Sequence, residues 1–143
     1  MSEELIEKEL SYKIMQAAFE VHNQLGPGFP ESIYNKAMTR ELVAQGMEVE
    51  QQKQILVYYK GKPLGEFFLD NVVNRCVILE LKAVSELAPI HEQQALSYLK
   101  ATGLLLAIVI NFGTPRVTYK RVVNTTSRYI RSSHTFRSTV MQP

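Results

Sequence analysis

Residues 65–82 read GEFFLDNVVNRCVILELK, and this pattern predicts two β-strands joined by a short turn. Besides Glu66 near its start and Arg75 in the turn, the stretch has three charged residues: Asp70, which is the only aspartate of the chain, Glu80 and Lys82. The two-residue period of a strand places Glu80 and Lys82 on the same face. Because burying a charge is costly unless it is paired or bound to an ion, the stretch predicts a site with chemistry of its own.

The three charged residues suit a metal site that acts on phosphate. Mg²⁺ prefers oxygen ligands and is commonly held by one or two carboxylates together with water and substrate phosphate. Asp70 and Glu80 can supply those carboxylates, and Lys82 can orient the attacking water and offset negative charge in the transition state. The alternative is a surface ion pair between Glu80 and Lys82, with Asp70 beside a turn.

Further motifs surround this core in a fixed order. They are VHNQLGPGF at residues 21–29, GFPESIY at 28–34, HEQQALSYLK at 91–100 and the strand end INFG at 110–113. With Asp70 and the Glu80-Leu81-Lys82 segment between them, these motifs make residues 5–123 resemble the PD-(D/E)xK nuclease superfamily and, within it, the small proteins called GxxExxY. Leu69 stands where the superfamily motif has proline, a departure that the superfamily widely tolerates.

The resemblance implies an α/β, restriction-endonuclease-like core with a central mixed β-sheet flanked by α-helices. It also implies a phosphodiesterase that depends on Mg²⁺ or Mn²⁺, with Asp70 and Glu80 as metal ligands and Lys82 as the catalytic partner. Glu31 has a counterpart in similar nucleases that is thought to be a further ligand, although the helix dipole alone also favours an acid there. Tyr34 lies on the same helix face and can contact a phosphate or Glu31, or can pack in the core.

A polar stripe marks the third predicted helix. His91, Gln94 and Tyr98 are three and four residues apart and therefore share a face. Gln94 and Tyr98 resemble the Q-x3-Y motif of nucleases that act at DNA ends, so we expect both in the catalytic site. We expect His91 to contact the substrate; the alternative is a histidine on the solvent-facing surface.

The charges are unevenly distributed along the chain. Up to Glu92 there are nine basic and fourteen acidic residues, whereas the seven charged residues after it are all basic. Such a basic half can follow a phosphate backbone, so we expect nucleic acid, with DNA favoured, as the partner. The basic residues predicted to bind it are Lys100, Arg116, Lys120 and Arg121. The alternative is a solvated strand face followed by a basic tail.

The domain organisation follows from the hydrophobic periodicity. Residues 1–123 are predicted to form one nuclease-like domain, and residues 124–143 a basic Ser/Thr/Arg-rich tail that is flexible or orders on a partner. The predicted helices are 5–25, 31–45 and 90–102, and the predicted strands are 49–59, 64–73, 76–84, 104–111 and 116–123.

Several other classes are excluded by the sequence. It has no P-loop or dinucleotide-binding glycine pattern, and one cysteine with three widely spaced histidines makes no zinc site. No apolar stretch reaches the roughly 18 residues of a membrane span and no secretory signal is recognisable, so we expect a cytoplasmic protein without a membrane partner. The small size favours a homodimer. The alternative to a metal-dependent nuclease is a non-catalytic nucleic-acid-binding or assembly protein on the same fold, but the intact acids and lysine favour the enzyme.

Overall fold

The computed structural model describes residues 7–124, which form three helices and five strands. In chain order these are α1 (Lys8–Leu25), α2 (Glu31–Ala44), β1 (Val49–Tyr59), β2 (Lys62–Val73), β3 (Val77–Lys82), α3 (Pro89–Thr102), β4 (Leu106–Asn111) and β5 (Thr118–Val123). Every predicted helix and strand is present, with ends that differ by a few residues. Apart from Asn124, the predicted tail lies outside the described residues. None of the helices in the described part has the length and apolar character needed to cross a membrane.

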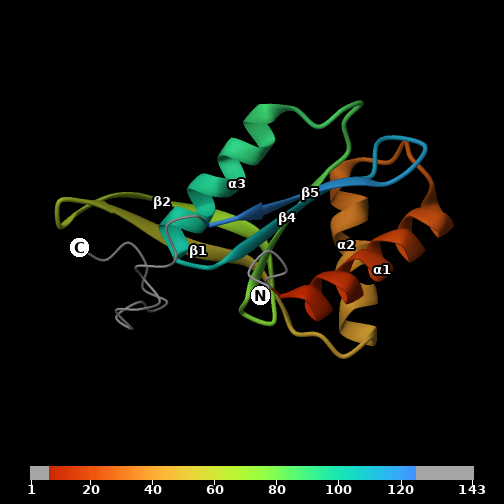
Figure 1. Cartoon of the computed structure of the whole chain (residues 1–143), viewed down its shortest axis with the longest axis horizontal. Helices are drawn as coiled ribbons and strands as arrows, with labels where there is room; N and C mark the ends of the chain where they lie inside the picture. Colours follow the sequence, from red (N-terminus) through yellow and green to blue (C-terminus); the bar gives the residue numbers. More distant parts are fainter. Residues whose placement is uncertain (1–6, 125–143) are drawn as a thin grey trace.

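The strands form one mixed sheet in the order β1-β2-β3-β4-β5. β3 and β4 run parallel, and the other neighbouring pairs are antiparallel. A parallel pair needs a crossover connection, and α3 provides it by passing over the sheet between β3 and β4 (Figure 1). The prediction of an α/β, restriction-endonuclease-like fold with a central mixed sheet and flanking helices is therefore confirmed.

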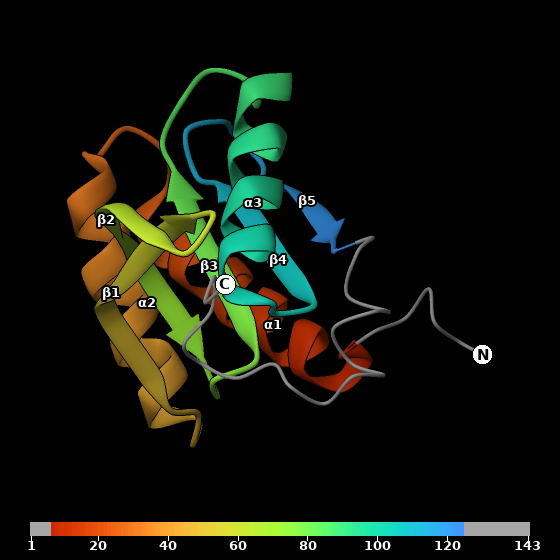
Figure 2. The same ribbon diagram turned by 90° about the vertical axis from the view of Figure 1, so that its left-hand side faces the viewer.

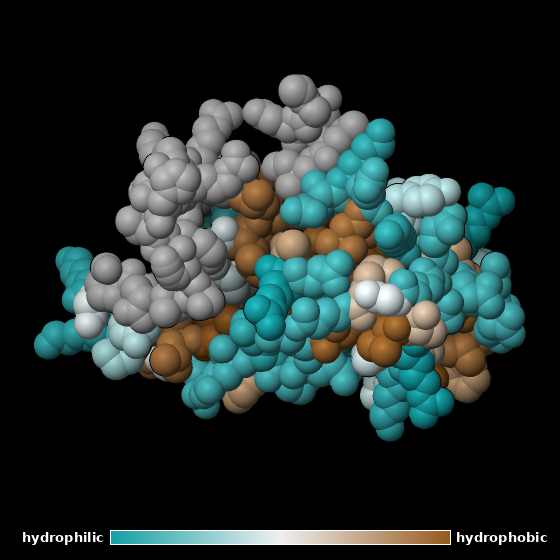
Figure 3. Space-filling view, turned by 90° about the horizontal axis from the view of Figure 1, so that it is seen from below, coloured by the Kyte–Doolittle hydropathy of each residue, from teal (hydrophilic) through white to brown (hydrophobic). Residues whose placement is uncertain are grey.

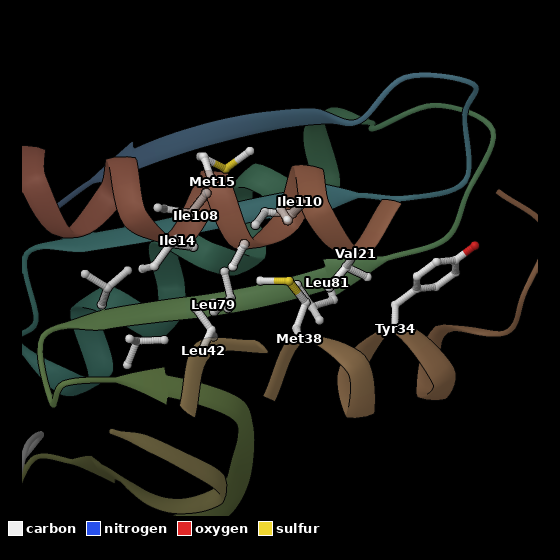
Figure 4. Packing of buried hydrophobic residues seen from close by; sticks show 14 of the residues in the cluster. Ile14, Met15, Val21, Tyr34, Met38, Leu42, Leu79, Leu81, Ile108 and Ile110 are labelled. Atoms are coloured by element: carbon white, nitrogen blue, oxygen red, sulfur yellow. The ribbon is translucent and has the colours of Figure 1, made fainter. Parts of the chain in front are cut away.

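The sheet lies between two helical layers. α1 and α2 pack on one face and α3 packs on the other (Figure 2). On β3, Leu79 and Leu81 point toward α1 and α2, as Figure 4 shows, whereas Ile78 points toward α3. All of β4, and all of β3 except Lys82, is buried. Because both faces of these strands are covered, a charged residue on β3 such as Glu80 is drawn into the interior.

Strand β4 and the residues after it hold the end of β3. Asn111, the last residue of β4, is fully buried, and its side chain exchanges two hydrogen bonds of 2.9 Å with the backbone of Val84. The amide of Phe112 donates to the carbonyl of Lys82 at 2.8 Å. A side chain at Gly113 would collide with the Val84 carbonyl, so the close approach of the two segments requires glycine there. These contacts fix the backbone that carries Lys82 into the site.

The β1–β2 hairpin projects beyond the rest of the sheet (Figure 1). Its turn is tighter than the predicted turn at residues 60–63, because only Lys60 and Gly61 connect the strands, both with positive φ. Pro63 belongs to β2 and pairs with Tyr58, next to a shift in register after Val57. Proline is tolerated in a sheet at such an irregularity because it cannot complete a regular ladder.

Candidate active site

The two predicted metal ligands of the core meet where β2 and β3 separate. The ladder between these strands ends at the pair Asn71 and Leu79, so Asp70 and Glu80 are the next residues outward on each strand. Opposite residues on antiparallel strands are close enough for their side chains to interact. In agreement with this placement, the charge of Asp70 contributes to the raised pKa of Glu80.

Glu80 is an acid held in the protein interior. The residue is 6% exposed, and its Oε2 atom has no hydrogen-bond partner among residues 7–124. The pKa of Glu80 is raised to about 7, first by burial and then by the charge of Asp70, while Lys82 opposes the shift and Glu31 adds a smaller increase. A buried carboxylate oxygen without a partner is stabilised by a proton or by a cation. Glu80 is therefore poised to bind either.

The carboxylates of Asp70 and Glu80 suit a divalent cation that also binds the substrate. Within residues 7–124, no group of three or more His, Cys, Asp and Glu side chains is arranged to hold a metal ion by itself. Mg²⁺ does not require such a cage, since it commonly binds one or two carboxylates and completes its coordination with water and phosphate. Asp70 and Glu80 would hold the cation, which would satisfy the unpartnered oxygen of Glu80.

Glu31 begins α2 and acts on the same group of charges. Burial raises its pKa, the charge of Lys82 lowers it, Asp70 raises it and His91 lowers it. In the described part of the chain, Glu31 does not complete a three-residue metal cluster with Asp70 and Glu80. Its position in the first helical turn also favours a carboxylate. Glu31 therefore lies beside the site, at a helix start that itself favours an acid.

Lys82 is the last residue of β3 and shares the face of Glu80. None of the ion pairs formed among residues 7–124 includes Lys82. With Glu80 buried, the alternative of a surface ion pair between these two residues does not describe the structure. The charge of Lys82 instead lowers the pKa of both Glu80 and Glu31, so its ammonium group lies near both acids. This positive charge is available to a substrate or to water.

Helix α3 brings Gln94 and Tyr98 to the two acids. Burial and the charges of Glu80 and Asp70 raise the pKa of the Tyr98 hydroxyl, whereas a hydrogen bond with the Gln94 side chain lowers it. The Tyr98 ring stacks on Phe67 of β2, with ring centroids 4.8 Å apart. This packing fixes the ring and places its hydroxyl within electrostatic reach of the carboxylates.

His91, the third residue of the stripe, caps the start of α3. Its Nδ1 atom accepts a 3.0 Å hydrogen bond from the backbone N–H of Ala88. The bond satisfies one of the amide groups near a helix start, where N–H groups lack intrahelical partners. The sequence predicts substrate contact or solvent exposure for His91, and it does not reveal this cap.

Tyr34 holds the loop in front of α2. Its side chain is fully buried, and its hydroxyl donates to the carbonyl of Gly26 and accepts a 3.3 Å hydrogen bond from the amide of Phe29. The ring stacks on Phe112 with centroids 4.7 Å apart, and Figure 4 shows it on the side of α2 that also carries Met38. The structure therefore favours the core-packing alternative for Tyr34 over the predicted substrate contact.

Replacing Tyr34 by phenylalanine should loosen this loop without opening the core. The ring and its stack on Phe112 remain, but Gly26 and Phe29 each lose a partner. We expect the free energy of unfolding, measured by urea denaturation, to fall by roughly 1–3 kcal/mol, the cost of unsatisfied buried groups. Tyr12→Phe, at a residue that is 65% exposed, is the control and should change little. A normal stability with a raised KM would instead mean that the hydroxyl of Tyr34 contacts substrate.

Two of the four basic residues predicted to bind nucleic acid lie on opposite faces of the sheet. Lys120 lies opposite Val109 on the side of α3, where it pairs with Glu92 at 3.6 Å. Arg121, the next residue of β5, lies opposite Ile108 on the side of α1. Because side chains alternate along a strand, these two basic residues cannot line one groove.

The other two predicted basic residues come from different elements. Lys100 is exposed on α3, and Arg116 is exposed in the loop between β4 and β5. The same loop is tied to the end of α1, where Nε2 of His22 lies 2.9 Å from the carbonyl oxygen of Thr114. On the face shown in Figure 3, hydrophilic side chains cover most of the described surface, and the apolar areas between them are separate. The basic residues predicted to bind a nucleic acid are thus dispersed over α3, β5 and the loop before β5.

Gln52 contacts Asp70, and the sequence does not reveal this contact. It belongs to β1, and its Nε2 atom donates to Oδ1 of Asp70 at 3.4 Å. In the sequence it lies within the polar run EQQKQ at residues 50–54, which matches no motif. Only the register of β1 against β2 brings the two residues together.

Comparison with known proteins supports the architecture. The sequence model of the PD-(D/E)XK nuclease superfamily matches residues 8–122, from α1 to β5. The crystal structure of SSO0001 has a similar fold, with a TM-score of 0.54 and 15% sequence identity over 77% of this chain and 61% of that one. This chain therefore spans less than two thirds of that protein's length. No curated protein sequence matches this chain. Since the superfamily match covers most of the sequence, the chain belongs to the PD-(D/E)XK nuclease superfamily.

Proposed function

We propose that the protein is a nuclease that hydrolyses phosphodiester bonds in nucleic acid, with DNA as the favoured substrate, and that it depends on Mg²⁺ or Mn²⁺. The observation that carries the proposal is the buried carboxylate of Glu80, which lies beside Asp70 and Lys82. In the described part of the chain, one oxygen of this carboxylate has no hydrogen-bond partner and Lys82 has no ion pair. A purely structural acid in such a place normally has an ion-pair or hydrogen-bond partner. Membership of the superfamily supports the same chemistry. The motif GFPESIY at residues 28–34 supports a place in the GxxExxY group.

The acids and the lysine have different roles in the proposed reaction. Asp70 and Glu80 would hold the cation, with Glu31 assisting from α2. When bound, a divalent cation supplies charge stabilisation at the phosphate and lowers the pKa of water. The ammonium group of Lys82 would orient that water and offset the negative charge that develops on the phosphate. Since no acid among residues 7–124 forms an ion pair with Lys82, its charge is available for this task.

Residues from α3 and β5 would position the substrate. The amide of Gln94 and the hydroxyl of Tyr98 carry hydrogen-bond donors beside the acids and would orient the phosphate. Lys100 and Lys120 would contact the nucleic-acid backbone through charge. For Lys120 this means leaving Glu92, an exchange that costs little because exposed ion pairs contribute about 0–1 kcal/mol. A homodimer would extend the contact along a duplex.

Cleavage of labelled single- and double-stranded DNA and RNA tests the proposal, with Mg²⁺, Mn²⁺ or EDTA present. We expect cutting with metal and none with EDTA. Metal should also raise the free energy of unfolding, by about 2.7 kcal/mol at a hundred times its Kd, and Asp70→Ala should abolish both effects. Glu20→Ala, at an exposed acid on α1, is the control and should retain both. Salt-sensitive binding without cutting or metal stabilisation would favour the non-catalytic nucleic-acid-binding protein instead.

A further inference from the structure

The ladder between β1 and β2 is interrupted at the position of Asp70. Gln51 pairs with Asn71, and Lys53 pairs with Leu69, but Gln52 and Asp70 between them do not form a register pair. The two residues nevertheless lie opposite one another, each flanked by regular pairing. The interruption is therefore confined to one position, which is that of the predicted metal ligand Asp70.

The backbone of Gln52 adopts an unusual conformation at this interruption. Its φ is 53°, in the left-handed region that residues with a Cβ atom avoid. Within residues 7–124, four other non-glycine residues have positive φ, and all four lie at a helix start or in a turn: Glu7, Lys60, Asn74 and Arg75. Among the described strands, Gln52 is the one non-glycine residue with positive φ. Conformations of this kind cluster at functional sites, where the surrounding structure maintains them.

The direction of the Asp70 side chain is not set by the strand alone. Leu69 and Val72 both pack in the cluster on the side of α3, although they are three residues apart and a regular strand would place them on opposite faces. Asn71 donates to Asn35 of α2 and Val73 packs on that same side, so Asn71, Val72 and Val73 alternate regularly and the break lies between Leu69 and Asp70. A side chain at such a break needs another contact to orient it. That contact comes from Gln52, whose Nε2 atom donates a hydrogen bond of 3.4 Å to Oδ1 of Asp70.

We infer that Gln52 is a positioning residue for metal binding, which orients the carboxylate of Asp70. Its left-handed backbone places the amide against Oδ1, and this contact leaves the second oxygen of Asp70 available to a divalent cation. The contact is long for a hydrogen bond, which suits a group that guides a carboxylate without competing strongly for it. The inference rests on the proposed function, since it assigns Asp70 to the cation.

Mn²⁺ affinity tests this inference, measured by titration calorimetry on the full chain without nucleic acid. Gln52→Ala removes the amide and keeps the strained backbone, whereas Gln52→Gly removes the amide and relieves the strain. We expect both variants to bind Mn²⁺ about 10-fold more weakly than the wild type, the usual size of the effect when an outer partner of a metal ligand is removed. Without metal, Gln52→Gly should melt at a higher temperature than Gln52→Ala.

The control is Gln54→Ala on the same strand. Gln54 also donates its side-chain amide to a carboxylate across the hairpin, that of Glu66, but it has no positive φ and is not opposite Asp70. Its loss should leave Mn²⁺ affinity unchanged. Cleavage by Gln52→Ala should recover at saturating Mn²⁺, which a merely destabilised variant would not show.

The outcomes separate the two proposals. If the wild type binds Mn²⁺ and Asp70→Ala does not, the metal role of Asp70 stands, and wild-type affinity in both Gln52 variants would then overturn only the positioning role. Equal weakening by Gln54→Ala would also overturn it, because the effect would not be specific to Gln52. If the wild type itself does not bind Mn²⁺, the proposed function fails and the positioning role fails with it.

Discussion

Lys82→Ala is expected to reduce metal-dependent cleavage by roughly 10²- to 10³-fold, the usual loss when one group that stabilises transition-state charge is removed. Lys82 lies near Glu80 and Glu31 and has no ion pair within residues 7–124. Its removal therefore takes a positive charge from the reacting phosphate without leaving a partner unsatisfied. Its backbone stays in place because the amide of Phe112 holds the Lys82 carbonyl. Initial rates at saturating Mg²⁺ measure the loss of cleavage, and urea denaturation measures whether the stability is unchanged.

A comparison with Glu80→Gln separates the role of the lysine from that of the acids. Lys82→Ala should still bind Mn²⁺ because both carboxylates remain, whereas Glu80→Gln should lose both Mn²⁺ binding and cleavage. Lys62→Ala removes the same side chain at an exposed position at the start of β2 and should cleave at the wild-type rate. Near-wild-type cleavage by Lys82→Ala would exclude a catalytic role for that residue.

The stability of the metal-free protein is expected to fall as pH rises between about 4.5 and about 7. Glu80 has a folded-state pKa of about 7 against an ordinary value of 4.5, so in this interval the folded state binds more protons than the unfolded state. Stability falls with pH wherever the folded state holds the extra proton. The shift corresponds to about 3 kcal/mol in the free energy of unfolding. The loss is complete above the folded-state pKa, where the buried carboxylate is ionised.

Glu80→Gln should remove most of this pH dependence, because glutamine fills a similar volume and never ionises. Urea denaturation in EDTA at about pH 5 and about pH 8 measures the effect, and at the higher pH the variant should be the more stable protein by up to about 3 kcal/mol. Mg²⁺ should restore stability to the wild type at high pH and leave the variant unchanged. Glu20→Gln, at an exposed acid, should behave like the wild type. A wild-type stability that rises over the same interval would contradict the burial of Glu80.

The secondary structure could be predicted from the sequence because each element carries its own periodicity. The apolar run at residues 104–111 predicts a strand, and the structure forms β4 there and buries all of it. The apolar spacing of α1 and the glycine after it predict its last residue, Leu25, which the structure shows. These signals are local, since they depend on residues within one or two turns of each other.

Side-chain placement at the site could be predicted only in part. The period of β3 correctly puts Glu80 and Lys82 on one face, but it does not show that the face is closed by α3 and that Glu80 loses its contact with water. The same reasoning fails for β2, where the alternation breaks at Asp70. For Tyr34, helical spacing indicates a face of α2 but does not reveal that the hydroxyl is committed to Gly26 and Phe29.

The sequence by itself determined the order of helices and strands, the family resemblance and the residue types of the site, because apolar periodicity and motif order are properties of the chain alone. Tertiary structure decided which charges meet. Pairing of β2 with β3 brings Asp70 to Glu80, alternation along β5 separates Lys120 from Arg121, and pairing of β1 with β2 adds Gln52. The physical reason is that burial and charge interactions depend on distances between segments far apart in the chain, and strand register sets those distances.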